Sequence, residues 1–487
     1  MLQVSEKEVK NRLWFDNPWW EEGEKIEERF AKLPRRAYFG RFYSLLSERS
    51  INRAIILMGP RRVGKTVMVY HAIDRLLQEQ NAKSILYLSL ETPIYTGLSL
   101  EKILNLFLDE FGHKRTSRLT IFFDEIQYLR DWEVHLKSLV DSFPSFKFIA
   151  TGSAAAALRL KSRESGAGRF TEFMLPPLTF VEYLSFINRE DELITRNETN
   201  NEVTFRATNI EQLNEEFINY LNYGGYPEAV FSDIIRSDSS RYIKSDIVDK
   251  VLLRDLPSLY GVSDIQELNR LFTTLAYNTG NEVTLEALSQ SSGVAKNTLK
   301  RYLEYLEAAF LIKRINRIDE NAKRFTRTTS FKVYLTNPSM RAALFGYVNT
   351  DSEAMGALAE TAIYSQLFHG DVSEQIYYAR WKKGEVDMVM LNPLTQKPKW
   401  CIEVKWSDRI ASNPGELEGL MQFIGDNNLR FDTKVTTKTR SSLLALASTS
   451  IRFVPTSIET YSLAKNILET KDAMRLLELP ISQIEIF

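Results

Sequence analysis

The chain has 487 residues, of which 44% are hydrophobic, 11% aromatic and 26% charged, and its formal net charge is −1. At roughly 150 residues per domain, this length predicts about three domains. The composition excludes collagen-like, low-complexity and largely disordered proteins. The near-neutral balance excludes a basic field over the whole molecule, so any surface for nucleic acid has to be local.

Cysteine and histidine are too scarce for several classes of site. The single cysteine, Cys401, excludes an internal disulfide framework and a multi-cysteine zinc site, and it is expected to be a buried strand residue. The four histidines lack metal-ligand spacing, so a histidine-rich metal site is not expected. The first residues show no signal-sequence pattern, and no apolar run approaches the roughly 18 residues that span a bilayer. We therefore expect a cytoplasmic protein without a membrane partner.

Four short apolar runs alternate with helical stretches between residues 54 and 180. The runs are Ala54–Met58, Ser84–Leu90, Leu119–Phe123 and Phe146–Thr151. Runs of this length and character are typical of buried parallel strands, and the amphipathic stretch Val67–Leu77 predicts a crossover helix after the first of them. The pattern predicts an α/β fold in which helices cover both faces of a parallel sheet.

A glycine-rich loop of the form GxxxxGKT stands between the first predicted strand and this helix. It is typical of a P-loop, because glycines let backbone N–H groups converge on phosphate oxygens and the helix N-terminus adds a favourable dipole. We expect Lys65 to reach the β- and γ-phosphates of ATP and the Thr66 hydroxyl to ligate Mg²⁺. The alternative is a chance glycine-rich turn, which is disfavoured because strand, loop and helix occur together. The expected nucleotide-binding residues are Gly59, Pro60, Arg61, Arg62, Val63, Gly64, Lys65 and Thr66.

The third apolar run ends in two acidic residues, Asp124 and Glu125. This is the Walker B arrangement, in which Asp124 would hold the Mg²⁺ shell and Glu125 would polarise the attacking water. The alternative is an ordinary acidic turn at the end of a strand. The presence of Glu125 favours hydrolysis over binding alone.

Polar and basic residues follow the fourth run. Ser153 is the first candidate for the γ-phosphate sensor, and Thr151 is the second. The alternative role for Ser153 is that of a helix N-cap. Of Arg159, Arg163 and Arg169, the last is our candidate arginine finger, acting in cis or from a neighbouring subunit. A solvated basic face is the alternative for each arginine.

The order of these motifs, together with later ones, resembles a large family of prokaryotic AAA-like P-loop ATPases. The stretches that carry the resemblance are GPRRVGKT, IFFDEIQ, ATGSA and residues 168–184, with residues 17–21 before the P-loop and 224–228 after it. Members of this family carry a C-terminal domain of uncharacterised or restriction-endonuclease-like type. The resemblance covers nearly the whole chain, and it implies an ATPase core, a winged-helix unit and a nuclease-like tail.

A helix-turn-helix pattern follows near residues 283–306. Leucine and tyrosine residues at positions i, i+3, i+4 and i+7 of its second helix predict a buried stripe. Over residues 296–332 there are ten basic and four acidic residues, a local charge of +6. This favours a winged helix on DNA, and a solvated face on a structural module is the alternative. The candidate DNA-contacting residues are Lys296, Asn297, Lys300 and Arg301.

Carboxylates and a lysine recur in the C-terminal segment. Glu360 lies in a predicted helix, Asp387 in a predicted strand, and Glu403 and Lys405 share one face of the next strand. This constellation resembles the PD-(D/E)XK nuclease superfamily. Asp387 and Glu403 would ligate Mg²⁺ or Mn²⁺, Glu360 would be an auxiliary ligand, and Lys405 would orient water or stabilise developing charge. The alternative is an amphipathic strand with a polar face of glutamate and lysine.

The motifs and resemblances together predict five segments. They are residues 1–50 (an N-terminal arm), 51–180 (a P-loop ATPase core), 181–260 (a helical lid), 261–335 (a winged helix-turn-helix) and 336–487 (a mixed α/β nuclease-like domain). The favoured function is ATP hydrolysis that controls a Mg²⁺-dependent DNA-processing nuclease, in a defence or mobile-element setting. The alternatives are a non-nucleolytic ATP-dependent switch that binds DNA or a partner protein, and a signalling ATPase whose tail recognises a partner. Self-association is left open.

Overall fold

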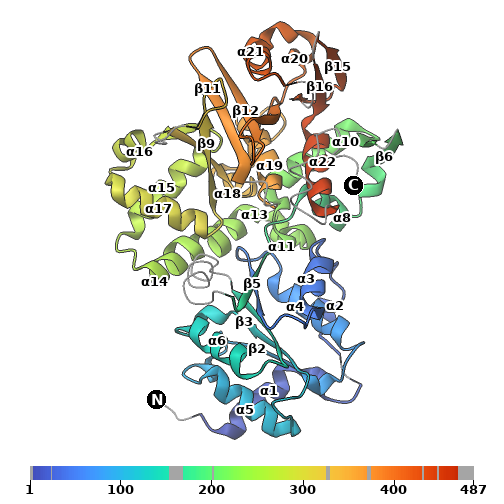
Figure 1. Cartoon of the computed structure of the whole chain (residues 1–487), viewed down its shortest axis with the longest axis vertical. Helices are drawn as coiled ribbons and strands as arrows, with labels where there is room; N and C mark the ends of the chain where they lie inside the picture. The colour runs from blue at the N-terminus through green and yellow to red at the C-terminus, as the bar shows by residue number, and fades with distance from the viewer. Residues whose placement is uncertain are drawn as a thin grey trace. The chain divides into compact units, whose positions relative to one another are not determined.

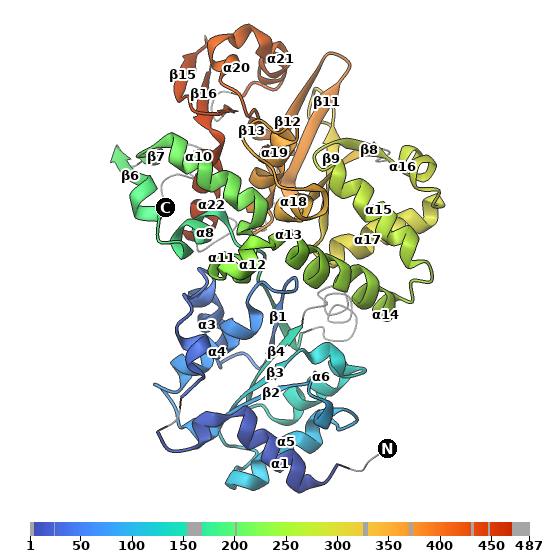
Figure 2. The same ribbon diagram turned by 180° about the vertical axis from the view of Figure 1, so that it is seen from behind.

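The computed structural model describes residues 4–23, 25–152, 168–199, 202–324, 330–369, 374–429, 433–446 and 449–469. The chain divides into two compact units, Met1–Pro176 and Pro177–Phe487 (Figure 1, Figure 2). Among the helices in the described ranges, none is long and apolar enough to cross a membrane.

The N-terminal unit is built on a parallel five-stranded sheet in the order β2-β3-β4-β1-β5. Its strands are β1 (Ala54–Met58), β2 (Ile85–Ser89), β3 (Thr120–Asp124), β4 (Lys147–Gly152) and β5 (Phe170–Met174). Every residue of β1, β3 and β4 is buried, which accounts for their largely apolar sequences. The predicted parallel α/β sheet is confirmed. The edge strand β5 was not predicted, because its residues are mostly half-exposed and give no apolar run.

Two groups of helices cover this sheet, one on each face (Figure 1). One group is α2 (Glu28–Ala31), α3 (Phe39–Ser47) and α4 (Lys65–Leu76), and the other is α1 (Glu6–Asp16), α5 (Leu100–Phe111) and α6 (Trp132–Ser142). Short 3-10 turns complete the unit, at η1 (Pro18–Trp20), η2 (Ala82–Ser84), η3 (Pro93–Tyr95) and η4 (Ile126–Tyr128). The helix α4 begins at the end of the P-loop, as predicted.

The segment expected to be an N-terminal arm packs against the edge strand β2. The Asn17 side chain donates to the Tyr87 carbonyl oxygen at 2.8 Å and accepts from the Tyr87 N–H at 2.7 Å. The Trp20 indole donates to the Ile85 carbonyl oxygen at 2.8 Å, and both Trp19 and Trp20 are buried. These side chains satisfy backbone groups that an edge strand otherwise presents to solvent.

The C-terminal unit contains a mixed nine-stranded sheet in the order β15-β16-β14-β13-β12-β11-β9-β10-β8. The strands are β8 (Glu282–Thr284), β9 (Ile312–Ile318), β10 (Ser330–Leu335), β11 (Ile376–Trp381), β12 (Gly384–Leu391), β13 (Pro398–Glu403), β14 (Thr433–Thr437), β15 (Ser442–Ala445) and β16 (Ser450–Pro455). Strand β9 pairs in parallel with β11, so strands on both sides of residue 335 belong to one sheet. A separate hairpin is formed by β6 (Ile194–Thr199) and β7 (Glu202–Ala207).

Alternate residues of the central strands feed two hydrophobic cores. Met388 and Met390 of β12 face the core formed with α19 (Met355–Leu367) and α22 (Thr456–Glu469). Val389 and Leu391 face the opposite core, formed with α21 (Glu418–Asp426). This alternation follows from the two-residue period of a strand. Cys401 is buried in the second core, as expected for a strand residue.

Three helices stand beside β8, β9 and β10. They are α15 (Ile265–Tyr277), α16 (Leu285–Ser292) and α17 (Lys296–Ala308). Gly293, with a φ of 73°, ends α16 and allows the turn into α17, so the predicted helix-turn-helix is present. The predicted buried stripe of α17 is confirmed at Leu299, Tyr302, Leu303 and Leu306.

The remaining described helices of this unit are short or irregular. They are α8 (Phe180–Phe186), α9 (Glu190–Leu193), α10 (Ile210–Asn219), α11 (Pro227–Phe231), α12 (Asp233–Ser237), α13 (Ser239–Tyr242), α14 (Leu256–Tyr260), α18 (Ser339–Phe345) and α20 (Arg409–Ser412). The π-helical segments are η5 (Tyr220–Gly224), η6 (Ile243–Asp249) and η7 (Val251–Asp255), and η9 (Pro414–Leu417) is a 3-10 turn.

Candidate functional site

The P-loop connects the end of β1 to the start of α4 in the N-terminal unit. Gly59 has no room for a side chain, because a Cβ there would lie 2.1 Å from the Leu175 carbonyl oxygen. Gly64 precedes α4 with φ 92° and ψ 27°, a left-handed conformation that glycine adopts without strain. The helix begins at Lys65, so its unpaired N–H groups and the positive end of its dipole lie at the loop. The backbone thus has the form of an anion site.

The ammonium group of Lys65 is held inside the loop. The residue is 5% exposed, and its Nζ donates to the carbonyl oxygens of Gly59 at 3.0 Å and Pro60 at 2.7 Å. Both acceptors are neutral. Because an anionic oxygen adds charge–charge attraction to the hydrogen bond, a phosphate oxygen is a stronger partner for this ammonium group than either carbonyl.

Arg36 supports the loop from the N-terminal segment. It is buried, and it donates through Nη1 to the Val63 carbonyl oxygen at 2.6 Å and through Nη2 to the Pro176 carbonyl oxygen at 3.0 Å. This role was not predicted. Leu33-Pro34-Arg35-Arg36 is a short basic stretch, and its sequence gives no signal that one of the two arginines is buried.

Asp124, at the end of β3, is the centre of a buried polar cluster. Its Oδ2 accepts from the Thr66 hydroxyl at 2.9 Å and from the Tyr87 hydroxyl at 3.0 Å, and its Oδ1 accepts from the Thr151 hydroxyl. Burial and the adjacent Glu125 carboxylate raise the pKa of Asp124 above its ordinary value, against the lowering effect of the three hydroxyl groups. The structure therefore brings together Thr66 and Asp124, the two residues predicted to hold Mg²⁺ at the nucleotide site.

Glu125 directly follows Asp124 and has a φ of 55°, in the left-handed region. Its N–H donates to the Thr151 hydroxyl oxygen at 3.2 Å, and its carboxylate accepts from the Gln127 side-chain amide. Left-handed backbone in a residue other than glycine costs free energy and is common at active sites. Thr151 thus orients both acidic residues, while Ser153, Arg159 and Arg163 lie outside the described residues.

Arg169 lies at the edge of the sheet opposite the P-loop. It precedes β5, and its carbonyl oxygen accepts from the N–H of Ala54, the first residue of β1. The five residues of β1 span roughly 16 Å, which an arginine side chain does not bridge. Its guanidinium group instead pairs with Asp141. The geometry excludes a contact in cis with phosphates at this P-loop, and a role at a neighbouring subunit's nucleotide stays a prediction.

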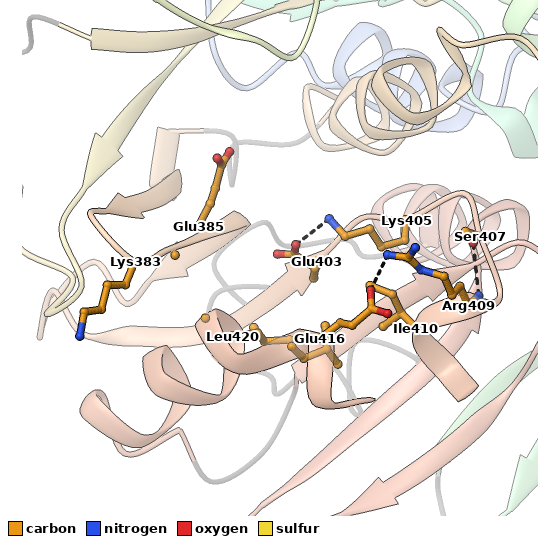
Figure 3. A pocket seen from close by; sticks show the side chains of 12 residues that line it. Lys383, Glu385, Glu403, Lys405, Ser407, Arg409, Ile410, Glu416 and Leu420 are labelled. Atoms are coloured by element: carbon orange, nitrogen blue, oxygen red, sulfur yellow. Dashed lines mark hydrogen bonds and ion pairs between the residues drawn. The ribbon is translucent and has the colours of Figure 1, made fainter. Parts of the chain in front are cut away.

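The second predicted site lies in the C-terminal unit, where α19, β12 and β13 bring three predicted residues together with Lys405. Lys405 was predicted to lie in the same strand as Glu403, but β13 ends at Glu403 and Lys405 follows it. We call Glu360, Asp387, Glu403 and Lys405 the carboxylate site. The Asp387 carboxylate accepts from the Val404 N–H at 2.9 Å, and the Asp387 N–H donates to Glu403 at 3.4 Å. Lys405 Nζ lies 2.7 Å from Glu403 Oε1 and 3.8 Å from Asp387 Oδ2. Figure 3 shows Glu403 and Lys405 facing one another.

Lys332, on β10, is part of the same cluster and was not predicted. Its Nζ lies 2.7 Å from Glu385 Oε1, 3.0 Å from Glu360 Oε1 and 3.3 Å from Asp387 Oδ1. Its side chain is 4% exposed, so its three ammonium protons face carboxylates and little water. The Tyr334 hydroxyl also donates to Glu360. In the sequence, Lys332 is notable only as one of the ten basic residues of the +6 stretch.

Burial and neighbouring charges shift the pKa values of the three carboxyl groups in different directions. Burial and then the Asp387 carboxylate raise the pKa of Glu360 to about 7 and that of Glu403 to about 8, against the nearby ammonium groups. Burial also disfavours ionised Asp387, but Lys332, Lys405 and the Val404 N–H outweigh it and lower the pKa of Asp387 below its ordinary value. Asp387 is therefore the anionic centre of the site.

Two adjoining cavities open at these residues. One, of about 370 Å³, is lined by Lys332 and the four residues of the carboxylate site. The other, of about 580 Å³, shares Glu403 and Lys405 and extends toward Arg409, which pairs with Glu416 (Figure 3). Within the described part of the chain, no three acidic, histidine or cysteine side chains are arranged to hold a metal ion. The carboxylates are instead paired with lysines.

The predicted DNA-contacting residues of α17 are all exposed. They are Lys296, Asn297, Lys300 and Arg301. Lys296 pairs with Glu286 of α16, so part of its charge is balanced within the helix-turn-helix. Lys300 and Arg301 lie on the face opposite the buried stripe, where they are able to meet a partner.

Two family models match different parts of the chain. Residues 51–184 match the model of an AAA domain, and residues 214–351 match that of a domain of unknown function (DUF8612). An uncharacterised protein of Methanocaldococcus jannaschii is 25% identical over 370 residues, which cover 74% of this chain and 76% of that protein. An uncharacterised protein of Haemophilus influenzae is 24% identical over 378 residues, 76% of this chain and 86% of that protein.

Two solved structures are also similar to the chain. A Walker-type ATPase of Pyrococcus abyssi shows 17% identity and a TM-score of 0.38, covering 67% of this chain and 99% of that one. The ORC2 protein of Aeropyrum pernix shows 15% identity and a TM-score of 0.37, covering 68% of this chain and 96% of that one. The match to the AAA domain model and the geometry of the P-loop and Asp124 identify residues 51–184 as an AAA-like P-loop ATPase domain.

Proposed function

We propose that the N-terminal unit binds and hydrolyses ATP with Mg²⁺, and that the C-terminal unit carries a Mg²⁺-dependent, nuclease-like site that processes DNA. The observation that carries the first half is the 2.9 Å hydrogen bond between Thr66 and Asp124 beside the buried Lys65. The Thr66 hydroxyl and the Asp124 carboxylate are hard oxygen donors, which suit Mg²⁺. Bound Mg²⁺ would neutralise phosphate charge.

The chain's own residues divide the hydrolytic reaction between them. Lys65 binds the β- and γ-phosphates and stabilises their charge in the transition state. Glu125 accepts a proton from water as the water oxygen bonds to the γ-phosphorus and the bond to the bridging oxygen breaks, which leaves ADP and phosphate. Thr151 positions the base, because its hydroxyl oxygen accepts from the Glu125 N–H.

Replacing Lys65 tests the nucleotide site. We expect Lys65→Ala to weaken ATP binding at least tenfold, because the phosphates lose their contact with the Lys65 ammonium group. A charge-assisted hydrogen bond of this kind is worth roughly 1.5–3 kcal/mol. Calorimetric titration of the full chain with ATP and Mg²⁺ measures this. Lys114→Ala removes an equal charge from an exposed position of the same unit and should bind ATP as the parent does. Equal affinities in the two variants would contradict the assignment.

The carboxylate site supports the second half of the proposal. Asp387, Glu403 and Glu360 supply the oxygen atoms that Mg²⁺ or Mn²⁺ prefers, and the bound metal would polarise the scissile phosphodiester. Lys405, 2.7 Å from Glu403, would orient the attacking water or stabilise charge that develops on the phosphate. The adjoining 580 Å³ cavity gives room for a segment of nucleic-acid backbone.

A plasmid-cutting assay tests this half separately. We expect Mg²⁺- or Mn²⁺-dependent cutting that falls at least a hundredfold in Lys405→Ala, since one preorganised donor is worth on the order of 3 kcal/mol at a transition state. Lys397→Ala removes the same charge from an exposed residue just before β13 and should cut as the parent does. Reactions with and without ATP report whether the nucleotide controls access. Cutting that survives Lys405→Ala would remove the site assignment.

A second function, a non-nucleolytic ATP-dependent switch, is favoured by one observation. The Lys332 ammonium group already contacts Glu360, Asp387 and Glu385, so a divalent cation has to displace it. If the pairs persist, the C-terminal unit binds DNA or a partner protein without cutting it. Absence of cutting by the parent chain with either metal, together with ATP-sensitive DNA binding, would support this function over the first.

A further inference from the structure

A cationic pocket lies at the edge of the parallel sheet where the strands begin. It has a volume of about 420 Å³. Its polar lining comes from the connections before β1, β3 and β4 and from the first residue of β4, namely Arg49, Asn52, Thr116, Arg118, Ser145 and Lys147. The P-loop lies at the other edge of the same sheet, roughly 16 Å away along β1. The two sites are therefore separate.

Lys147 is the most buried cation of this pocket. It is 6% exposed, and its Nζ donates to the Glu48 carbonyl oxygen, a neutral acceptor, at 2.8 Å. Burial and then the positive charge of Arg49 lower the pKa of Lys147 to about 8, against the Glu48 carboxylate. The ammonium form is thus less stable here than in water.

Two arginines add to the positive charge. Arg49 donates to the Leu119 carbonyl oxygen at 3.2 Å and to the Thr120 hydroxyl oxygen at 2.7 Å, and both acceptors are neutral. Burial and then the charge of Arg118 lower the pKa of Arg49. Arg118 itself is exposed. Each of the three cations therefore stands near another cation.

Carboxylates do not balance this charge. Among the described residues, none that lines the pocket is acidic. Glu48 acts on Lys147 from outside the lining, but its carboxylate is exposed and accepts from the Ser50 N–H at 2.6 Å. Three positive charges thus border one cavity, and their mutual repulsion would be relieved by a bound anion.

A purely structural role accounts for part of this arrangement. Arg49 and Lys147 tie the segment after α3 to the starts of β3 and β4 through neutral acceptors. Neutral side chains with hydrogen-bond donors would make the same ties without the repulsion. Nor do these ties explain why Arg118 lines the same cavity. A structural role therefore does not account for the excess positive charge, whereas a site for an anionic ligand does.

We propose that this pocket binds a phosphate-type oxyanion. The planar guanidinium groups of Arg49 and Arg118 suit the oxygen pairs of a phosphate, and Lys147 adds a point charge from the buried side. The hydroxyl groups of Thr116 and Ser145 are further donors on the lining. The phosphoryl group belongs either to free phosphate or pyrophosphate or to the backbone of a nucleic acid. This site does not depend on the function proposed above.

The test uses the full chain carrying Lys65→Ala, so that phosphate binding at the P-loop is weakened. Inorganic phosphate, pyrophosphate and a short single-stranded oligonucleotide are titrated into this chain by calorimetry. The same titrations are made after adding Arg118→Ala, or Lys114→Ala as the matched exposed control. Because Arg118 is exposed, its replacement leaves the core intact. We expect Arg118→Ala to weaken phosphate or pyrophosphate binding about tenfold, and Lys114→Ala to leave it unchanged.

The three ligands distinguish the sources of the phosphate. Arg118-dependent binding of phosphate or pyrophosphate alone identifies a free-phosphate site. If the oligonucleotide also loses affinity in Arg118→Ala, the pocket takes the nucleic-acid backbone. No binding by any of the three ligands, or equal binding in the Arg118→Ala and Lys114→Ala chains, would overturn the proposal. Binding of a polyglutamate peptide in place of all three would overturn it as well.

Discussion

At the residue scale, two buried lysines differ in the charge of the groups that they contact. Lys65 donates to two neutral carbonyl oxygens, and an anionic phosphate is a stronger partner than either of them. Lys332 is bound to three carboxylates, so it already acts as the cation of its site. The first environment favours the entry of an anion, and the second limits the entry of a metal cation.

Replacing Lys332 is expected to destabilise the fold and to create metal binding. Lys332→Met removes the ammonium group that contacts the buried Glu360 and leaves Asp387 with Lys405 alone, which should lower the free energy of unfolding by about 3–5 kcal/mol. Mg²⁺ or Mn²⁺ should then raise the melting temperature of the variant more than that of the parent, because the freed oxygens are able to ligate it. Thermal unfolding with and without each metal measures both effects.

Lys434 provides the matched control for this variant. It is as buried as Lys332 and pairs with Glu459 at 3.0 Å, outside the carboxylate site. Lys434→Met should therefore destabilise the protein without gaining a response to metal. An equal metal response in both variants would show that the effect does not arise at the carboxylate site.

The two lysines also mark what could be predicted at this scale. Lys65 was predicted, because its partners lie within six residues and the motif is local. Lys332 was missed, because Glu360 and Asp387 lie 28 and 55 residues away and meet it only after the sheet has formed. The four residues of the carboxylate site were anticipated from the resemblance to the PD-(D/E)XK superfamily. Strand periodicity was expected to place Glu403 and Lys405 on one face, but β13 ends at Glu403 and Lys405 follows it.

At the element scale, α17 combines a structural face with an exposed basic face. Leu299, Tyr302 and Leu303 are buried, whereas Lys300 and Arg301 between them are exposed. The helix follows a tight turn at Gly293, as in helix-turn-helix modules that read DNA. The arrangement leaves two cations free of the core and able to approach phosphates.

The double variant Lys300→Ala, Arg301→Ala tests this face. We expect weaker DNA binding on every sequence and a plot of log affinity against log salt that is shallower by about 2, because two phosphate contacts are lost. Fluorescence anisotropy at several salt concentrations measures both. The control Arg241→Ala, Lys244→Ala removes two exposed cations from another part of the unit. Identical salt slopes for the two double variants would place DNA binding elsewhere.

The elements themselves were predictable to different degrees. Four of the five strands of the parallel sheet, β1 to β4, gave apolar runs, because their residues are almost all buried. The nine-stranded sheet was not foreseen, since it depends on β9 pairing with β11 across a long stretch of chain. A hydrophobic pattern indicates that a strand is buried, but it does not identify the strand that pairs with it.

At the scale of the whole molecule, one chain joins an anion-binding unit to a carboxylate-rich unit. Control of the second by ATP requires that ATP bind with different affinity to states that differ in the second site. The near-zero net charge results from averaging regions of opposite sign, because the +6 stretch and the cationic pocket are balanced by acidic residues elsewhere. The composition thus excluded a uniform nucleic-acid surface and left local ones open.

The most direct test of the central claim is the steady-state ATP turnover of Glu125→Gln. We predict that turnover falls at least a hundredfold, while ATP binding is kept, because the variant loses the base and retains Lys65 and Thr66. Glu172→Gln, an exposed glutamate on β5 of the same sheet, should turn over ATP as the parent does. ATP bound without turnover in Glu125→Gln is the result that supports a hydrolytic P-loop unit, and unchanged turnover would contradict it.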